Sequence, residues 1–377
     1  MKFLHTGDLH IGKTVNDFSM IEDQRFILSQ ITDIARKEEA EAVVIAGDIY
    51  DRAIPPAEAV TLLNDFLTQM ARTGIPVLLI SGNHDSPERV GFAEEILQEQ
   101  DIHIAGVYKN TLKKVTFNDA YGEVSFVLMP FIKPAVAAAK TSGEAVEKML
   151  AAEGGIGEDR RILVTHFFVT NGGKEPELSD AETTIHVGGL DNVEVSLLDG
   201  FDYVALGHIH RPQRIGERQV YYAGAPLAYS FSEAGQRKTV NLVEIKERGE
   251  VSVKQIPVSP RHGMRKIRGR LEELMADEVV EAADRLDYIQ AQLTNEEELI
   301  DPIGALRTVY PNIMQIMLTK NEESEGGEYE SKAAERKKSI PELFSGFYEV
   351  IRKEGPDDER MRIILETARE TEGEDGI

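Results

Sequence analysis

The sequence contains no cysteine among its 377 residues. Disulfide bonds and thiolate metal sites are therefore excluded, and a reducing compartment would suit the chain. No uninterrupted apolar run approaches the ~18 residues that a membrane-spanning helix needs, so we expect no association with a membrane. The first residues, MKFLHTGDLH, are polar and charged where a signal peptide needs an apolar segment. Secretion is therefore not expected.

Basic residues are also scarce. The chain has 42 Lys and Arg against 66 Asp and Glu, which gives a formal net charge of −24. This balance argues against a protein that coats nucleic acid through charge alone, because such binding needs Lys and Arg to neutralise phosphates. The basic residues are unevenly spread, since the segment 261–270, RHGMRKIRGR, contains no acidic residue. Net charge therefore leaves the ligand open. A phosphate-binding G-x-x-x-x-G-K-[ST] loop is absent as well.

Apolar, strand-like runs alternate with helical patterns over the first part of the chain. Ile21–Lys37 and Ala57–Thr73 carry apolar residues at helical spacing, and two prolines precede the second of these segments. Strands that alternate with helices favour an α/β fold. Later strands at 219–224, 238–245 and 250–258 are joined by short segments, which favours a meander. The sequence therefore predicts a layered sandwich of two sheets flanked by helices.

A composition change near residues 258–263, VSPRHG, predicts a domain boundary. We expect a main domain over 1–258 and a small α/β module over 259–321, with strands near 264–271, 287–294 and 313–320. The segment 322–339 is polar and charged, which is typical of a linker. Two helices are expected within 340–377, separated by Gly355 and Pro356. Because these helices can bury little surface against each other, we expect them to dock elsewhere.

Polar side chains follow five of the predicted strands at the point where each strand ends. The carboxyl ends of strands in an α/β sheet form the rim on which ligand sites assemble. One histidine at such a position is typical of an ordinary surface residue, but five histidines on one rim are not. These strand-end residues are Asp8, His10, Asp48, Asp51, Asn83, His84, His166, His208 and His210. The other four histidines, His5, His103, His186 and His262, are expected to lie outside the site.

The donor types at this rim favour metal ions. Carboxylate, imidazole and amide oxygen without thiolate suit divalent Mn, Fe or Zn. Seven such side chains exceed the need of one ion, which favours two ions sharing a carboxylate. Two ions ~3.5–4 Å apart polarise a phosphoryl group and lower the pKa of a bound water to about 7. Since residues at i and i+2 of an extended chain point the same way, we expect His208 and His210 to serve one ion each.

The motifs DLH, GDIYD, GNHD, TH and GHIH occur in that order between residues 8 and 210. They resemble the five motifs of the calcineurin-like metallophosphoesterases. This resemblance implies a four-layer αββα sandwich with a small α/β capping domain and C-terminal helices. It implies that Asp8, His10, Asp48 and His210 hold one metal ion. It further implies that Asp48, Asn83, His166 and His208 hold the other, with Asp48 bridging.

The same resemblance implies a separate role for His84, which would protonate the leaving oxygen or bind the phosphate. An imidazole suits proton transfer near neutral pH, particularly when a carboxylate supports its charged form. In the family pattern Asp51 supplies that carboxylate, and Asp85 is either an alternative partner or a turn residue. Arg52 either contacts phosphate or is simply exposed.

Three longer stretches, HFFVTNGG, DYVALGHIHRPQ and YYAGAPLAYSFSE, are similar to the SbcD family of bacterial nucleases. The similarity covers essentially the whole chain, and the aspartate at position 51 resembles the bacterial branch. It implies a Mn²⁺-dependent phosphodiesterase, with Mg²⁺, Zn²⁺ or Fe²⁺ as alternatives, acting on double-stranded DNA ends and hairpins. The implied activities are 3′→5′ double-strand exonuclease and single-strand endonuclease, used in DNA recombination, replication and repair.

The SbcD resemblance also implies an assembly. The partner is the SbcC ATPase, which uses the ATP and binds the C-terminal helices, within a heterotetramer that contains a homodimer of this chain. The implied location is the cytoplasm, in association with the nucleoid. The module at 259–321 would cap the active site and contact DNA. Candidate DNA contacts are Arg52, Arg261, Arg265 and Lys266.

Two other functions fit parts of the sequence. A phosphodiesterase or phosphatase acting on nucleotides or proteins would carry the same five motifs. Turnover of small phosphoesters far faster than DNA would favour that interpretation. A catalytically silent scaffold for an ATPase is the other alternative, and the intact motifs argue against it.

Overall fold

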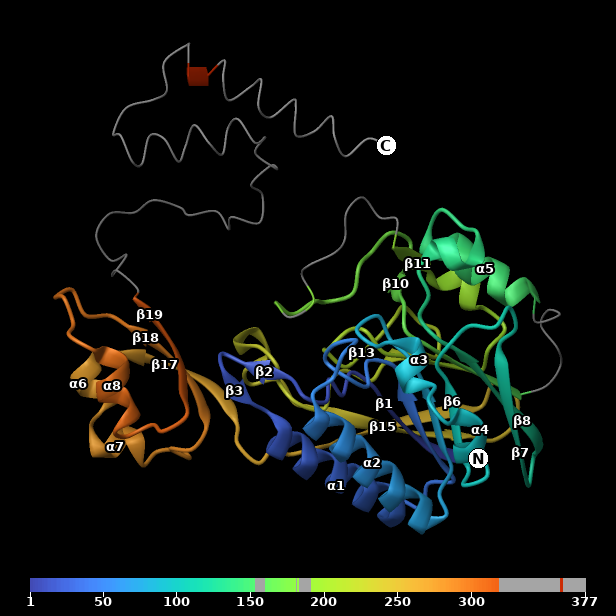
Figure 1. Cartoon of the computed structure of the whole chain (residues 1–377), viewed down its shortest axis with the longest axis horizontal. Helices are drawn as coiled ribbons and strands as arrows, with labels where there is room; N and C mark the ends of the chain where they lie inside the picture. Colours follow the sequence, from blue (N-terminus) through green and yellow to red (C-terminus); the bar gives the residue numbers. More distant parts are fainter. Residues whose placement is uncertain (153–159, 181, 183–190, 319–359, 362–377) are drawn as a thin grey trace. The chain divides into compact units, whose positions relative to one another are not determined.

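The computed structural model describes residues 1–152, 160–180, 182, 191–318 and 360–361 (Figure 1). The chain divides into two compact units, Met1–Lys320 and Asn321–Ile377. The predicted linker and C-terminal helices fall in the second unit, and apart from residues 360–361 they lie outside the described residues, as does His186. The fold below is therefore that of the first unit.

The first sheet has six strands in the order β16-β15-β1-β4-β5-β6. Its strands are β1 (Lys2–Thr6), β4 (Ala42–Ala46), β5 (Val77–Ile80), β6 (Ile102–Ala105), β15 (Thr239–Ile245) and β16 (Val251–Pro257). The four strands from β1 to β6 run parallel, and the β15–β16 hairpin adds to the β1 edge antiparallel. All carboxyl ends of the parallel strands therefore meet at one edge.

The second sheet also has six strands, in the order β13-β14-β12-β9-β8-β7. Its strands are β7 (Lys113–Asp119), β8 (Gly122–Met129), β9 (Arg160–Thr165), β12 (Tyr203–Leu206), β13 (Gln213–Arg214) and β14 (Val220–Tyr222). Here β8, β9, β12 and β14 are parallel, while β7 and β13 are antiparallel edges. Two small strand pairs, β2 (Thr14–Val15) with β3 (Phe18–Ser19) and β10 (Phe168–Thr170) with β11 (Asn192–Glu194), lie outside the two large sheets.

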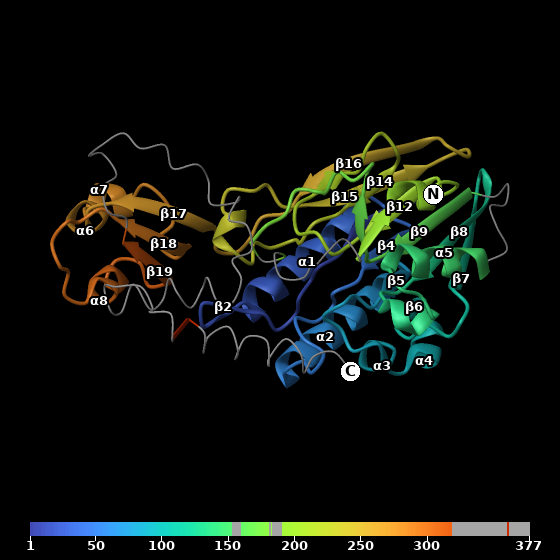
Figure 2. The ribbon, with the colours of Figure 1, turned by 90° about the horizontal axis from the view of Figure 1, so that it is seen from above.

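Helices cover the outer faces of the sheets and make four layers. The helices α1 (Ile21–Lys37) and α2 (Ala57–Thr73) have the bounds that the periodicity predicts, and both views show them alongside each other (Figures 1 and 2). Their buried residues join the first sheet in one apolar cluster, and α5 (Ser142–Ala152) joins the second sheet in another. Phe3, Phe126 and Tyr203 belong to a third cluster between the sheets. The predicted αββα sandwich is confirmed.

The predicted meander is wrong. Strand β14 pairs parallel with β12 in the second sheet, whereas β15 pairs antiparallel with β1 in the first. Of these three later strands, only β15 and β16 form a hairpin. Alternating burial looks the same at the edge of either sheet, so periodicity alone does not assign a strand to one of them. Partner choice comes from tertiary packing.

The small module has its own sheet and core. Its three parallel strands are β17 (Met264–Gly269), β18 (Tyr288–Leu293) and β19 (Ile313–Leu318). Ile289, Leu306 and Tyr310 lie in an apolar cluster confined to the module. The shorter helical segments of the unit are α3 (Pro87–Val90), α4 (Glu94–Gln98), α6 (Leu271–Leu274), α7 (Asp277–Val280), α8 (Pro302–Arg307), η1 (Pro134–Ala137), η2 (Val195–Leu198) and η3 (Phe231–Glu233). Within the described part of the chain, no helix combines the length and apolar content that a membrane crossing requires.

Candidate metal centre

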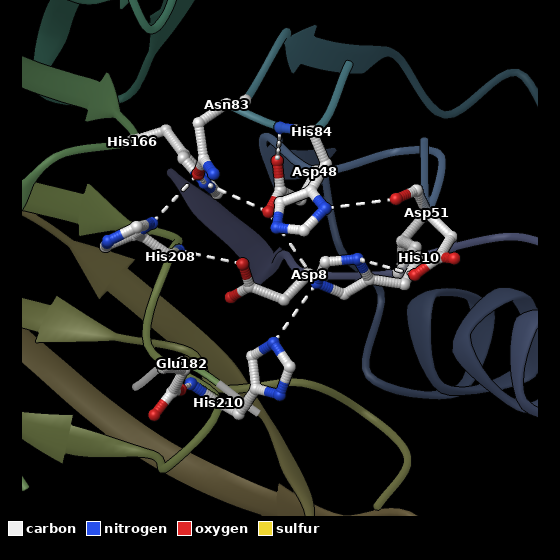
Figure 3. A network of polar contacts seen from close by, with 12 residues as sticks. Asp8, His10, Asp48, Asp51, Asn83, His84, His166, Glu182, His208 and His210 are labelled. Atoms are coloured by element: carbon white, nitrogen blue, oxygen red, sulfur yellow. Dashed lines mark hydrogen bonds and ion pairs between the residues drawn. The ribbon is translucent and has the colours of Figure 1, made fainter. Parts of the chain in front are cut away.

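The strand-end residues predicted from the sequence meet at one place between the two sheets (Figure 3). They follow β1, β4 and β5 of the first sheet and β9 and β12 of the second. Three groups have potential ligand atoms within 4.8 Å of one another: Asp8 with His10 and His210, His10 with Asp48 and His84, and Asp8 with Asp48 and His166. His5, by contrast, is buried away from these groups, against Tyr203 Oη at 2.9 Å.

One half of the centre brings two imidazoles together. The Nε2 atoms of His10 and His210 are 3.1 Å apart. Nδ1 of His210 lies 3.3 Å from the carboxylate of Glu233, and Nδ1 of His10 lies 3.7 Å from that of Asp51. These carboxylates favour a proton on each Nδ1, which leaves a lone pair on each Nε2. Two lone pairs facing each other repel unless a cation lies between them. Metal–nitrogen bonds of about 2.0–2.1 Å fit this separation.

The other half shows the same demand for positive charge. Nδ1 of His166 donates to the carbonyl oxygen of Ala46 at 2.7 Å, so the neutral ring presents its Nε2 lone pair to the centre. That atom lies 3.0 Å from Oδ1 of Asn83 and 3.3 Å from Oδ2 of Asp48, and Nδ1 of His208 lies 2.9 Å from the same Asn83 oxygen. Burial alone would lower the pKa of His166, but Asp48 raises it to about 9. Without a metal ion a proton supplies the charge; a cation would replace it.

Asp48 lies between the two halves. Its Oδ2 is 3.6 Å from Nε2 of His10 and 3.3 Å from Nε2 of His166 (Figure 3). Its Oδ1 accepts the backbone N–H of His84 at 2.9 Å. Burial alone would raise the pKa of Asp48, but the imidazoles, that of His166 above all, hold the pKa well below its ordinary value. An ionised carboxylate facing both halves has the geometry of a bridging ligand.

The buried polar atoms and the backbone both point to a missing cation. Among the described residues, Oδ2 of Asp8 and Nδ1 of His10 are buried without a hydrogen-bond partner. Asp8, His10, Asp48 and His208 all have positive φ values, of 50°, 44°, 48° and 99°. Each such non-glycine residue costs on the order of 1–3 kcal/mol, and this kind of strain collects at functional sites. The residues present therefore fit a divalent-metal centre.

Comparisons with known proteins agree with this geometry. The sequence model of the calcineurin-like phosphoesterases matches residues 1–212, and that of the type 5 capsule protein repressor C-terminal domain matches residues 260–351. The SbcD subunit of nuclease SbcCD from Staphylococcus epidermidis is 30% identical over 329 residues, 84% of this chain and 85% of the relative. The protein of the same name from Staphylococcus saprophyticus is 31% identical over 326 residues, 84% of each chain. The chain belongs to the SbcD family of calcineurin-like phosphoesterases.

Solved structures add little to this assignment. The protein TT1561 of Thermus thermophilus is 11% identical and covers 67% of this chain and 98% of its own length, with a TM-score of 0.41. A dimetal phosphatase from Danio rerio is 14% identical, covering 69% of this chain and 99% of its own length, with the same TM-score of 0.41. The family therefore rests on the sequence matches.

In this SbcD-family chain, His84 and Asp51 interact through the backbone. Nδ1 of His84 lies 3.0 Å from the carbonyl oxygen of Asp51. The carboxylate of Asp51 instead lies 2.7 Å from Nζ of Lys13 and 3.7 Å from Nδ1 of His10. The sequence predicts that this carboxylate supports His84; the structure gives that contact to the main chain and directs the carboxylate to His10. A motif states which residue is present but not which of its atoms is used.

Asp85 holds two ligand-bearing loops together. Its buried carboxylate accepts three backbone N–H groups, from Gly82 at 2.8 Å, Ile49 at 3.0 Å and Tyr50 at 2.9 Å. These donors belong to the loops that follow β5 and β4. Of the two roles left open by the sequence, the structure therefore shows the turn-stabilising one for Asp85.

Replacing Asp85 with alanine should lower the free energy of unfolding by about 2–4 kcal/mol, because three buried N–H donors lose a charged acceptor. Urea unfolding of the purified chain measures this change. The exposed Asp33 on α1 provides a matched control, and Asp33→Ala should change the free energy by no more than about 0.5 kcal/mol. Equal effects of the two substitutions would contradict the anchoring role.

A cavity of about 540 Å³ opens beside the centre. Its wall includes His84, Asn83 and His208 from the centre, together with Phe131 and Lys133. The reacting groups are thus open to a ligand on this side, and the lining offers an aromatic ring and a positive charge beside them.

The basic candidates differ in their surroundings. Arg265 lies 2.8 Å from Asp287 and over the ring of Tyr310, so its guanidinium is engaged within the module. Arg261 and Lys266 are exposed on the same segment. Arg52 is exposed as well and lies 3.7 Å from the carboxylate of Asp51.

Two residues beside His210 were not anticipated from the sequence. Glu233 and Lys238 are buried, and Nζ of Lys238 lies 2.5 Å from the Glu233 carboxylate. Burial alone would raise the pKa of Glu233, but the hydrogen bond from His210 and the charge of Lys238 lower it to about 2. The available signal was position: Glu233 ends the YYAGAPLAYSFSE stretch, 23 residues after His210.

Proposed function

We propose that this chain is the nuclease subunit of an SbcCD-type complex and hydrolyses phosphodiester bonds at DNA ends and hairpins with two divalent ions, Mn²⁺ in the first place. One observation carries the proposal. Donors from five strands of two sheets surround a single ionised carboxylate, Asp48, which faces both halves of the centre. The relatives named as SbcD subunits of nuclease SbcCD supply the DNA substrate and the SbcC partner.

The ligand sets follow from the two halves. Asp8, His10 and His210 hold one ion, Asn83, His166 and His208 hold the other, and Asp48 joins both. Imidazole, carboxylate and amide oxygen suit Mn²⁺, with Fe²⁺ and Zn²⁺ next. When bound, such a pair polarises the scissile phosphoryl group and lowers the pKa of the attacking water.

His84 performs the proton transfer. Its Nδ1–H donates to the carbonyl of Asp51 at 3.0 Å, which leaves Nε2 as the atom that delivers a proton to the leaving oxygen. The neutral carbonyl accepts the same bond whether or not Nε2 is protonated, so the ring keeps its orientation through the transfer. Asp51 therefore positions His84 through its main chain, while its carboxylate faces His10 and Lys13.

The remaining parts of the chain suit a DNA-bound complex. The exposed Arg261 and Lys266 support phosphate contacts by the module over 259–321, and Arg52 lies exposed beside the centre. Arg265 supports this surface indirectly, since it is bound to Asp287. The terminal segment 340–377 is the part proposed to bind SbcC, within a heterotetramer containing two copies of this chain. Such a complex would act in the cytoplasm, at the nucleoid.

Incubation of the purified chain with Mn²⁺ and an end-labelled DNA hairpin tests this function. Cleavage should require Mn²⁺, rise when SbcC and ATP are added, and fail when a chelator removes the metal. A small phosphodiester assayed in parallel separates the chemistry from the substrate. Brisk hydrolysis of the small ester without hairpin cleavage, even with SbcC present, would contradict the DNA substrate and favour a small-molecule phosphodiesterase.

A further inference from the structure

Two histidines of the centre, one from each half, are supported by different groups. His166 donates its Nδ1–H to a neutral backbone carbonyl, that of Ala46, at 2.7 Å. His210 instead has its Nδ1 3.3 Å from a buried carboxylate, that of Glu233. A carboxylate behind an imidazole fixes its tautomer and makes the opposite nitrogen a stronger metal ligand than a carbonyl does. The two halves of the centre are therefore built unequally.

Glu233 is held firmly in its place. It is 1% exposed, and its Oε1 lies 3.4 Å from the backbone N–H of Tyr229 and 3.4 Å from each of the hydroxyls of Ser179 and Ser230. Its Oε2 lies 2.5 Å from Nζ of Lys238. A carboxylate with this many donors has one available position, and that position faces His210.

Lys238 binds the same histidine at a second point. Its Nζ lies 3.2 Å from the backbone carbonyl oxygen of His210 in addition to its contact with Glu233. The side chain is 5% exposed, so its charge is buried and is balanced by Glu233. Glu233 thus fixes the ring of His210 and Lys238 fixes its backbone, both from the segment that begins at η3 and leads into β15.

We propose that Glu233 is a positioning residue for His210, with Lys238 as its buried counter-ion, and that this pair selectively strengthens the binding of the ion held by Asp8, His10 and His210. The proposal rests on the two-ion centre proposed above. It makes that ion the more tightly bound of the two, because a neutral carbonyl rather than a carboxylate supports His166. Loading is then ordered, and the ion beside Asn83 is the one that is gained or lost as the metal concentration changes.

Titration of the metal-free chain with Mn²⁺, followed by calorimetry and by the EPR signal of free Mn²⁺, tests this directly. Glu233→Gln keeps an oxygen for the Nδ1–H but removes the charge. It should weaken the binding of one ion about 10–100-fold and leave the affinity of the other within about threefold. Glu244→Gln, a half-buried glutamate on β15, is the matched control and should alter neither affinity.

If Glu233→Gln does not fold, the double variant Glu233→Gln with Lys238→Met removes both charges together and leaves no unpaired buried ion. The same selective weakening is expected there. A folded variant that binds both ions as tightly as the original chain, or that loses both equally, would overturn the proposal. Because metal binding is measured without DNA, a chain that shows selective weakening yet cuts no DNA would overturn the nuclease function and leave this inference standing.

Discussion

Replacement of Asp48 with asparagine is expected to weaken binding of both metal ions by more than about 100-fold and to lower DNA cleavage by about 10³-fold or more. Asparagine has the same shape, but it is neutral, and its amide nitrogen must face either His10 or His166. The carboxylate of Asp48 lies 3.6 Å from the first imidazole and 3.3 Å from the second, so one substitution affects both halves. Equilibrium dialysis with metal analysis measures the loss.

A second buried aspartate provides the control for this substitution. Asp119 lies on β7 and is paired with Arg160 at 2.6 Å, outside the three ligand groups. Asp119→Asn removes a buried negative charge of the same kind but should leave the metal content of the chain unchanged. Retention of two ions by Asp48→Asn would contradict the bridging role.

Replacement of His84 with glutamine is expected to lower the rate of hairpin cleavage by about 10²–10⁴-fold while both ions stay bound. Glutamine can still donate a hydrogen bond, but it cannot transfer a proton. The Nδ1 atom of His84 faces the Asp51 carbonyl, and its link to Asp48 runs through its backbone N–H, which any residue supplies. Metal retention and rate loss are therefore separable at this position.

Cleavage kinetics and metal content of the same His84→Gln preparation provide the measurement. Loss of an ion would contradict the division of roles, since His84 also lies within ligand distance of His10 and Asp48. An unchanged rate would contradict the catalytic role and would revive the alternative of a silent scaffold for an ATPase.

The sequence predicted those features that depend on local pattern. The bounds of α1 and α2 follow from apolar spacing, and the rim position of the ligand candidates follows from the ends of parallel strands. The donors assemble as predicted because each comes directly after a strand whose direction the α/β pattern already sets. Local order was sufficient for this part of the molecule.

Features that depend on tertiary contacts were not predicted. The carboxylate of Asp51 is drawn towards Lys13, at 2.7 Å, and no spacing rule states that preference. Glu233 reaches His210 only because the segment after β14 crosses from the second sheet to the first, the same crossing that made the predicted meander wrong. A glutamate in a polar stretch has the pattern of a surface residue until that crossing is known.

The low-temperature EPR spectrum of the Mn²⁺-loaded chain tests the bridged two-ion centre most directly. Two ions that share the Asp48 carboxylate should give an exchange-coupled spectrum, with two Mn²⁺ bound per chain, and Asp48→Asn should abolish it. A spectrum of isolated Mn²⁺ from one ion per chain, unaffected by Asp48→Asn, would contradict the centre described here.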